Sequence, residues 1–215
     1  MVKNMTNKLD ISPIKWIFFD VGSTIIDETK ACDHRALDML KNTDITFDEF
    51  ARKRIELSKQ GYDGNSQVIK YFGLTKTPWH HEDEQLCVSA KGILFYLKNK
   101  GYHLGIIANQ SKGLTDRLRK FDVLDYFELI ISSEDVGLAK PDKKIFQYAL
   151  ESADCSPNQA IMIGDRLDND IIPAKLVGMN TIWIRSGLSI YQDVSFGKGV
   201  ADIVIDELCS IELLF

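Results

Sequence analysis

From residue 85 onward, the sequence alternates between short apolar runs and amphipathic helical patterns. Each apolar run ends at a small or polar residue, as strands do where they enter a loop. Because parallel strands need a crossover connection, usually a helix, this alternation predicts an α/β fold with a three-layer, doubly wound parallel sheet. The expected strands are 102–108, 128–131, 160–163, 181–185 and 203–205, and the expected helices are 86–99, 114–121, 141–153, 171–176 and 208–214.

A further strand is predicted upstream, at Trp16–Phe19, where apolar residues run directly into Asp20 and a turn-prone Gly-Ser-Thr. A continuous apolar run is typical of a strand that is buried on both faces. Asp20 would then lie at the carboxyl edge of the sheet, where open parallel α/β proteins bind ligands. An aspartate that only caps the following turn remains an open alternative at this point.

Composition narrows the class of protein. The 215 residues, 45% of them apolar, fit one domain with a modest insertion. A net charge of -5 without a basic cluster argues against nucleic acid or an anionic membrane as a partner. The polar segment 1–13 and the lack of an apolar run near ~20 residues indicate neither secretion nor a membrane span. The cysteines form no C-x-x-C pair, which argues against zinc or disulfides and favours a reduced cytoplasm; they are Cys32, Cys87, Cys155 and Cys209.

Between residues 28 and 84, charged residues become dense and apolar residues such as Ala36 and Leu40 follow helical spacing. A helical insertion directly after the first strand would stand over the carboxyl edge of that strand. We therefore expect a lid that closes on a ligand, with an extension of the core as the alternative. The run His80–Glu84 resembles a metal-binding cluster, but adjacent side chains on one helix or strand do not converge on one ion. We therefore expect the run 80–84 to form a solvated hinge.

Polar side chains follow several of the predicted strands: Asp20, Asn109, Lys140, Asp165 and Asp170. Parallel topology brings strand ends to one edge of the sheet, so these side chains would meet in one crevice. Three carboxylates suit a hard, oxygen-preferring cation such as Mg²⁺. A lysine beside them would offset the like-charge repulsion that raises carboxyl pKa values. Taken singly, Lys140 could mark an ordinary helix start and Asp165 could be a loop residue.

The order and spacing of these residues resemble the motifs of the haloacid dehalogenase superfamily of aspartate-nucleophile hydrolases. The segments that carry the resemblance are Phe18-Phe19-Asp20-x-x-x-Thr24, Gly105–Asn109, Lys140-Pro141 and Gly164-Asp165-x-x-x-x-Asp170. Together they span nearly the whole chain beyond its N-terminal segment. The resemblance implies a discontinuous Rossmann-like core, residues 1–27 and 89–215, and a small helical cap, residues 28–88, that selects the substrate.

The resemblance also implies a role for each motif residue. Asp20 would attack a phosphoryl group to give an aspartyl-phosphate, and Lys140 would hold the charge. A small phosphorylated molecule is the implied partner. The implied ligands of Mg²⁺ are Asp20, Asp165, Asp170 and the main-chain carbonyl of Gly22. The implied phosphate-binding positions are Ala108, Asn109 and Lys140.

Two positions depart from the family pattern. Gly22 stands where the phosphatases of the family have a second aspartate, the general acid and base. Because that role is typically worth ~10²–10⁴-fold in rate, its loss predicts a slow enzyme. Ala108 replaces the Ser or Thr whose hydroxyl binds the transferring phosphoryl group. Backbone N–H groups around Asn109 and Ser111 would then be the remaining donors.

These residues favour a magnesium-dependent phosphatase of a small phosphorylated metabolite. A catalytically inactive binding or regulatory protein is the alternative, and a dehalogenase or phosphonate hydrolase is third. If another residue supplies the missing proton, Asp27 and His34 are the candidates. A positive φ angle at position 22 would be a different reason for glycine there.

Overall fold

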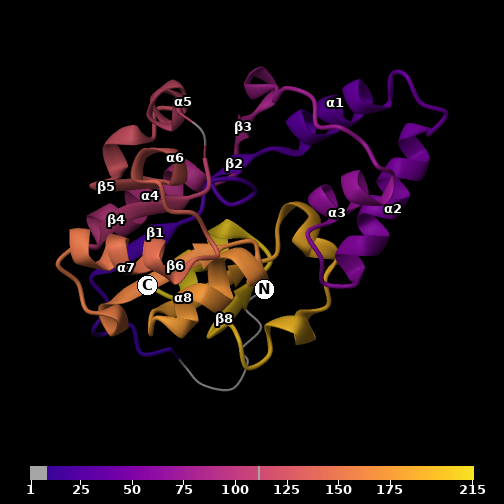
Figure 1. Cartoon of the computed structure of the whole chain (residues 1–215). Helices are drawn as coiled ribbons and strands as arrows, with labels where there is room; N and C mark the ends of the chain where they lie inside the picture. The colour runs from indigo at the N-terminus through magenta and orange to yellow at the C-terminus, as the bar shows by residue number, and fades with distance from the viewer. Residues whose placement is uncertain (1–8, 111) are drawn as a thin grey trace.

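The structure is a computed structural model that describes residues 9–110 and 112–215. Its centre is a sheet with the strand order β5-β4-β1-β6-β7-β8, and each neighbouring pair is parallel (Figure 1). The predicted doubly wound parallel sheet is therefore confirmed. The strands are β1 (Trp16–Phe19), β4 (His103–Ala108), β5 (Leu129–Ser132), β6 (Ala160–Gly164), β7 (Asn180–Ile184) and β8 (Ile203–Ile205).

The central strand is β1, whose residues are all buried. It pairs with β4 on one side and β6 on the other, so that Phe19 lies opposite both Ile106 and Ile163. Phe18 lies so close to Gly105 of β4 that a Cβ there would come within 2.6 Å of its ring. β4 and β5 lie on one side of β1, whereas β6, β7 and β8 lie on the other. The carboxyl ends of β1, β4 and β6 therefore surround a topological switch point, where such sheets bind ligands.

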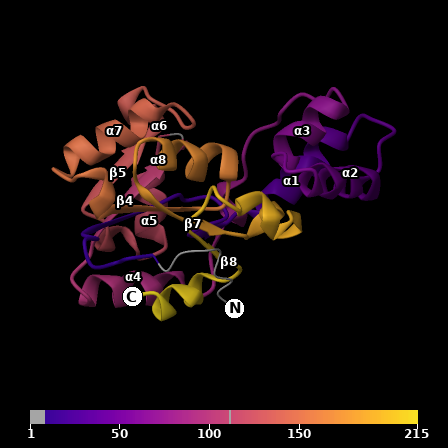
Figure 2. The ribbon, with the colours of Figure 1, turned by 90° about the horizontal axis from the view of Figure 1, so that it is seen from below.

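Helices cover both faces of the sheet (Figure 2). Ile17 and Phe19 of β1 belong to the apolar cluster that includes α4, α5 and η7, whereas Trp16 and Phe18 belong to the cluster that includes α7. Because side chains along β1 alternate between the two faces of the sheet, this strand contributes to the apolar core on each face. The helices of this part are α4 (Ala90–Asn99), α5 (Leu114–Lys120), η2 (Leu124–Tyr126), α6 (Ser133–Val136), α7 (Lys143–Ser152), η3 (Pro157–Gln159), η4 (Leu167–Ile171), α8 (Ile172–Leu176), η5 (Gly187–Tyr191), η6 (Val194–Gly197) and η7 (Leu208–Leu213).

The expected helical insertion forms α1 (Thr29–Leu40), α2 (Phe47–Lys59) and α3 (Gly64–Tyr71), which lie beside the sheet and its helices (Figure 2). These helices have an apolar cluster of their own, built from Ala36, Met39, Leu40, Phe50 and Val68. A capping box at Thr46 begins α2, and the Asp63 side chain caps α3. Where the chain leaves and re-enters the core, β2 (Ile26–Asp27) pairs antiparallel with β3 (Gln85–Leu86), and η1 (His81–Asp83) precedes the return.

Several predicted boundaries are wrong. The helix expected to start at residue 86 starts at Ala90, because residues 85–86 pair with β2 instead. The helix expected from Pro141 starts at Lys143, because Asp142 is its N-cap. A π-helical turn precedes α8, and the last helix is a 3₁₀ helix. The spacing of apolar residues does not distinguish these two helix types from an α-helix. The expectations for Ser111 and for residues 1–8 fall outside the described residues. Within the described residues, no helix combines the length and apolar character that crossing a membrane requires.

Candidate active site

Asp20 is the first residue after β1 and remains tied to the sheet. Its backbone N–H donates to the carbonyl of Ile163 at 2.8 Å, which holds the residue at the end of the strand. Its side chain, 12% exposed, borders a cavity of about 250 Å³. A strand end in the middle of a sheet is a rigid support, which suits a side chain that must present one atom to a ligand.

The ammonium group of Lys140 is completely buried and joins two carboxylates. It donates to Oδ1 of Asp20 at 2.5 Å and to Oδ1 of Asp170 at 2.6 Å. The side chain of Asn109 fixes the backbone of Lys140, because its Nδ2 donates to the Lys140 carbonyl at 2.7 Å while its Oδ1 accepts from the Lys140 N–H at 2.8 Å. Residues that follow four different strands, β1, β4, β5 and β6, are thereby held together, as the sequence predicts.

Asp165 and Asp170 both belong to the turn that follows β6. Asp170 packs directly over Gly164, where a Cβ would come within 2.5 Å of its carboxylate, so glycine is required at that position. The N–H of Arg166 donates to Asp170 Oδ2 at 3.0 Å and fixes its second oxygen. One carboxylate oxygen from each of Asp20, Asp165 and Asp170 lies within 4.8 Å of the others. The predicted carboxylate cluster is thus present in the structure.

These three carboxylates outnumber the positive charge of Lys140. Burial raises the pKa of Asp165 well above its ordinary value, and the negative charges of Asp170 and Asp20 raise it further. Burial also raises the pKa of Asp170 to about 6, although Lys140 opposes the shift. For Lys140, burial alone would lower the pKa, but Asp170 and Asp20 raise it above its ordinary value, so the ammonium stays charged. The cluster therefore has negative charge in excess.

This donor set fits a hard divalent cation. It offers carboxylate oxygens that lie close together, and Gly22, two residues after Asp20, borders the same cavity. Mg²⁺ binds through one or two carboxylates and keeps several waters, so it does not need a complete protein cage. A divalent charge would also relieve the repulsion that raises the pKa of Asp165.

The predicted phosphate-binding positions are only partly brought together. Ala108 is fully buried at the end of β4 and is not among the residues that line the cavity. Asn109 does line the cavity, but its side-chain amide is bonded to the main chain of Lys140. The backbone N–H of Asn109 thus stays the predicted donor, and Ser111, the second one, is outside the described residues.

Gly22 has no positive φ angle, so the explanation of this glycine by backbone conformation is wrong. The left-handed residue of the turn is Ser23, with a φ of 55°. The space beside Gly22 is instead filled by a carboxyl group, because a Cβ at this position would lie 2.6 Å from Oε2 of Glu28. Burial, together with the negative charge of Asp20, raises the pKa of Glu28 to about 7.

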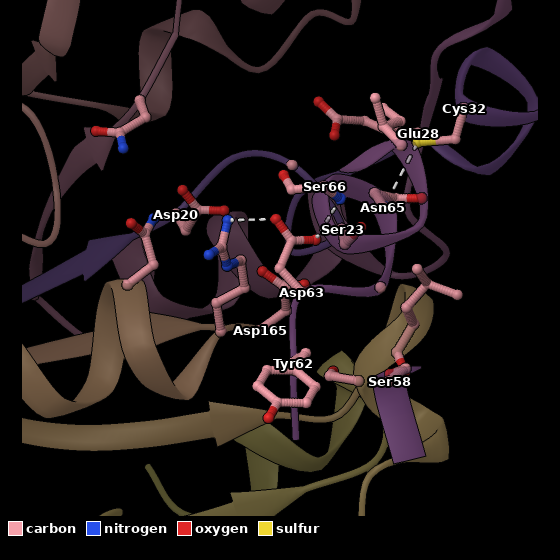
Figure 3. A pocket seen from close by; sticks show the side chains of 18 of the residues that line it. Asp20, Ser23, Glu28, Cys32, Ser58, Tyr62, Asp63, Asn65, Ser66 and Asp165 are labelled. Carbon is pink, nitrogen blue, oxygen red and sulfur yellow. Dashed lines mark hydrogen bonds and ion pairs between the residues drawn. The ribbon is translucent and has the colours of Figure 1, made fainter. Parts of the chain in front are cut away.

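The cavity lies between the sheet edge and the inserted helices (Figure 3). Asp20 and Asp165 border it from the core, while Glu28 and Asn65 border it from the insertion. An ion pair of 3.1 Å between Arg166 and Asp63 bridges the two sides. A ligand in this cavity would therefore touch both parts of the chain.

Known proteins resemble this chain in sequence and in fold. The family model described as haloacid dehalogenase-like hydrolase matches residues 17–184. The chain belongs to the haloacid dehalogenase-like hydrolases. It is 31% identical to a glyceraldehyde 3-phosphate phosphatase of Pyrococcus furiosus, over 91% of this chain and 90% of the relative. The crystal structure of a phosphatase from Thermococcus onnurineus has a TM-score of 0.65 and 28% identity, covering 94% of this chain and 97% of that one. A predicted phosphoglycolate phosphatase from Haemophilus somnus shares the fold, with a TM-score of 0.71 at 19% identity over 95% and 99% of the two chains.

In this haloacid dehalogenase-like hydrolase, the run 80–84, expected to be a solvated hinge, is solvated only in part: His81 and Glu82 are exposed, whereas Glu84 is buried. The side chain of Glu84 is only 1% exposed and accepts from Arg117 Nη1 at 2.8 Å. The short helix η1 also turns neighbouring side chains toward α1, so that ligand atoms of His34, His80, Glu82 and Asp83 lie within 4.8 Å of one another. Sequence reasoning missed Glu28, Gln110 and Arg117 as site residues, because no motif marks them.

The raised pKa values predict how the stability of this hydrolase depends on pH. The carboxyl groups of Asp170 and Glu28 have pKa values of about 6 and about 7 in the fold, above those of the unfolded chain. In that window the folded state binds more protons, so stability falls as pH rises. Without metal, we expect the thermal midpoint to increase by several degrees when pH falls from about 7.5 to about 5.5.

Differential scanning calorimetry in a chelating buffer measures this shift. The variant Asp170→Asn is the control, because it should flatten the profile by removing one of the titrating groups. A midpoint that falls or stays level over this range in the wild type would contradict the assigned electrostatics.

Proposed function

We propose that this hydrolase is a magnesium-dependent phosphatase that hydrolyses a small phosphorylated metabolite through a covalent phosphate on Asp20. The observation that supports this most strongly is the buried contact between Lys140 and Asp20 beside two further carboxylates. An oxyanion held rigidly at a cavity edge is a suitable nucleophile for a phosphoryl group. The relative from Pyrococcus furiosus, named a glyceraldehyde 3-phosphate phosphatase, supports the same reaction class.

In the first step, an oxygen of Asp20 forms a bond to phosphorus, and the bond from phosphorus to the ester oxygen breaks. In the second step, water attacks the phosphorus, and the carboxylate of Asp20 leaves as inorganic phosphate forms. Lys140 orients the carboxylate of Asp20 through its hydrogen bond of 2.5 Å. The backbone around Asn109 would donate to the phosphoryl oxygens, which favours the charge distribution of the transition state.

A bound Mg²⁺ would neutralise phosphoryl charge and orient the phosphoryl group against the nucleophile. We propose Asp20, Asp165 and the carbonyl of Gly22 as its direct ligands. Asp170 already accepts from Lys140 at 2.6 Å and from the N–H of Arg166 at 3.0 Å, so it suits an outer position better.

We further propose that residues 28–88 form a cap that selects the substrate. Arg35 and Lys76 line the cavity from this segment and would provide positive charge away from the carboxylate cluster. A cavity of about 250 Å³ limits the substrate to a small molecule. A short phosphate ester with a further polar group fits this combination of size and charge, and glyceraldehyde 3-phosphate is one such molecule.

A screen of small phosphate esters, including glyceraldehyde 3-phosphate, tests the proposal by measuring phosphate release with Mg²⁺ and with a chelator. We expect release with Mg²⁺ only, and loss of both release and Mg²⁺ binding in Asp165→Asn. Calorimetry of Mg²⁺ binding provides a readout that is independent of turnover. Metal binding without turnover of any ester would instead favour a binding or regulatory protein, for which the glycine at position 22 is the supporting observation.

A further inference from the structure

The carboxyl group of Glu28 occupies the space beside Gly22. A Cβ built on Gly22 would lie 2.6 Å and 2.9 Å from the two oxygens of Glu28 and 2.8 Å from its carboxyl carbon. Both residues line the same cavity as Asp20. A carboxyl group is therefore present where a side chain at position 22 would begin, although it comes from a residue six positions later in the chain.

We propose that Glu28 is the catalytic proton donor and acceptor of this hydrolase, in place of an aspartate at position 22. This inference rests on the phosphatase function proposed above. Glycine at position 22 then has a specific purpose, because any side chain there would displace the carboxyl group of Glu28.

A chain of polar contacts orients Glu28. The side chain of Gln110 borders the same cavity as the carboxyl group of Glu28 and lowers the pKa of that group. The Oε1 atom of Gln110 accepts from Nη2 of Arg117 at 2.5 Å, which leaves the NH₂ end of the amide to face Glu28. Nη1 of Arg117 in turn donates to the buried carboxylate of Glu84 at 2.8 Å. These partly buried contacts, which end at the buried Glu84, restrict the direction of a side chain that would otherwise be free to rotate.

The other candidates are engaged elsewhere. The Asp27 side chain is exposed, and its Oδ1 accepts from the N–H of Thr29 at the start of α1. The Nδ1 atom of His34 lies 2.7 Å from Asp83, and its ring stacks on His80 with 3.5 Å between the centroids. Neither residue lines the cavity that Asp20 borders, whereas Glu28 does.

With Glu28 in this role, every proton transferred in the reaction has a donor and an acceptor. As Asp20 bonds to phosphorus and the ester bond breaks, the electron pair goes to the leaving oxygen and the proton of Glu28 is transferred to it. The resulting Glu28 carboxylate then takes a proton from the water that attacks the aspartyl-phosphate. That step regenerates the carboxylate of Asp20 and the protonated Glu28, and the net reaction is hydrolysis of one ester bond.

The variant Glu28→Gln tests the inference with two leaving groups. On an alkyl phosphate such as glyceraldehyde 3-phosphate, we expect turnover to fall by about 10²–10⁴-fold, because the leaving oxygen needs the proton. On p-nitrophenyl phosphate, whose leaving oxygen is weakly basic, we expect a burst of nitrophenol followed by slow turnover. The phosphate should then accumulate on Asp20, where mass spectrometry detects it, because no base activates the water.

Three further variants separate catalysis from structure. Glu28→Asp should keep part of the activity, and Asp27→Asn should behave like the wild type. Glu28→Ala removes the carboxyl group and opens the space, so adding Gly22→Asp to it should restore alkyl phosphatase activity. Thermal midpoints of all variants confirm that they are folded.

The two proposals fail in different ways. If Glu28→Gln keeps the wild-type rate, or slows both substrates equally without phosphate on Asp20, the role of Glu28 is overturned while the phosphatase function stands. If the wild type releases no phosphate from any ester and never forms a phosphorylated Asp20, both proposals are overturned.

Discussion

Asp20→Asn should abolish phosphate release, with a loss of at least about 10⁴-fold, because an amide oxygen cannot replace the carboxylate nucleophile. The protein should still fold. Lys140 keeps its contact of 2.6 Å with Asp170, and an asparagine side chain has the same shape as the aspartate that it replaces. Steady-state phosphate release with the best ester from the screen measures the effect.

Asp27→Asn is the matched control for this substitution. Asp27 lies seven residues further along, is exposed, and accepts from the N–H of Thr29 at 2.9 Å, a bond that asparagine can also make. We expect unchanged turnover in the control. Activity that survives in Asp20→Asn at the level of the control would show that Asp20 is not the nucleophile.

Lys140→Met should cause the largest loss of stability. It leaves the buried carboxylates of Asp20 and Asp170 without the ammonium group that now contacts both. Breaking a buried ion pair by removing one partner costs about 3–5 kcal/mol. In a chain of this size, that corresponds to a fall in the thermal midpoint of roughly 10 °C.

The loss in Lys140→Met should shrink as pH falls toward about 5, because protonation of Asp165 and Asp170 removes the unbalanced charge. Lys143→Met is the control, since Lys143 is exposed at the start of α7. The midpoints of both variants are measured against the wild type at two pH values. A midpoint of Lys140→Met that matches the control would contradict the role assigned to the buried ammonium.

Much of the fold and part of the site can be predicted from the sequence. The apolar run Trp16–Phe19 has no polar residue on either face, so it can only be a strand covered on both sides. Because each strand ends at a recognisable polar residue and parallel strands share one edge, the meeting of Asp20, Lys140 and Asp170 follows from topology alone. Individual contacts need not be known for that step.

The position of Glu28 does not follow from such reasoning. Its carboxyl group reaches Gly22 because the chain turns at Ser23, in a left-handed conformation, and then pairs β2 with β3. The antiparallel pairing of β2 with β3 joins residues almost sixty positions apart in the sequence. Each of these strands has only two residues, which is too short for a periodic apolar pattern to predict it. Gly22→Asp alone should therefore not raise the activity, since the new side chain would collide with Glu28.

The central prediction is that Asp20 is the nucleophile that receives the phosphoryl group. Its most direct test is to mix the enzyme with p-nitrophenyl phosphate and Mg²⁺, quench the reaction in acid, and map phosphate on the peptides by mass spectrometry. We predict a phosphorylated peptide that contains Asp20, with more of it in Glu28→Gln and none in Asp20→Asn. Release of phosphate by the wild type with no phosphorylated Asp20 in either the wild type or Glu28→Gln would contradict the claim.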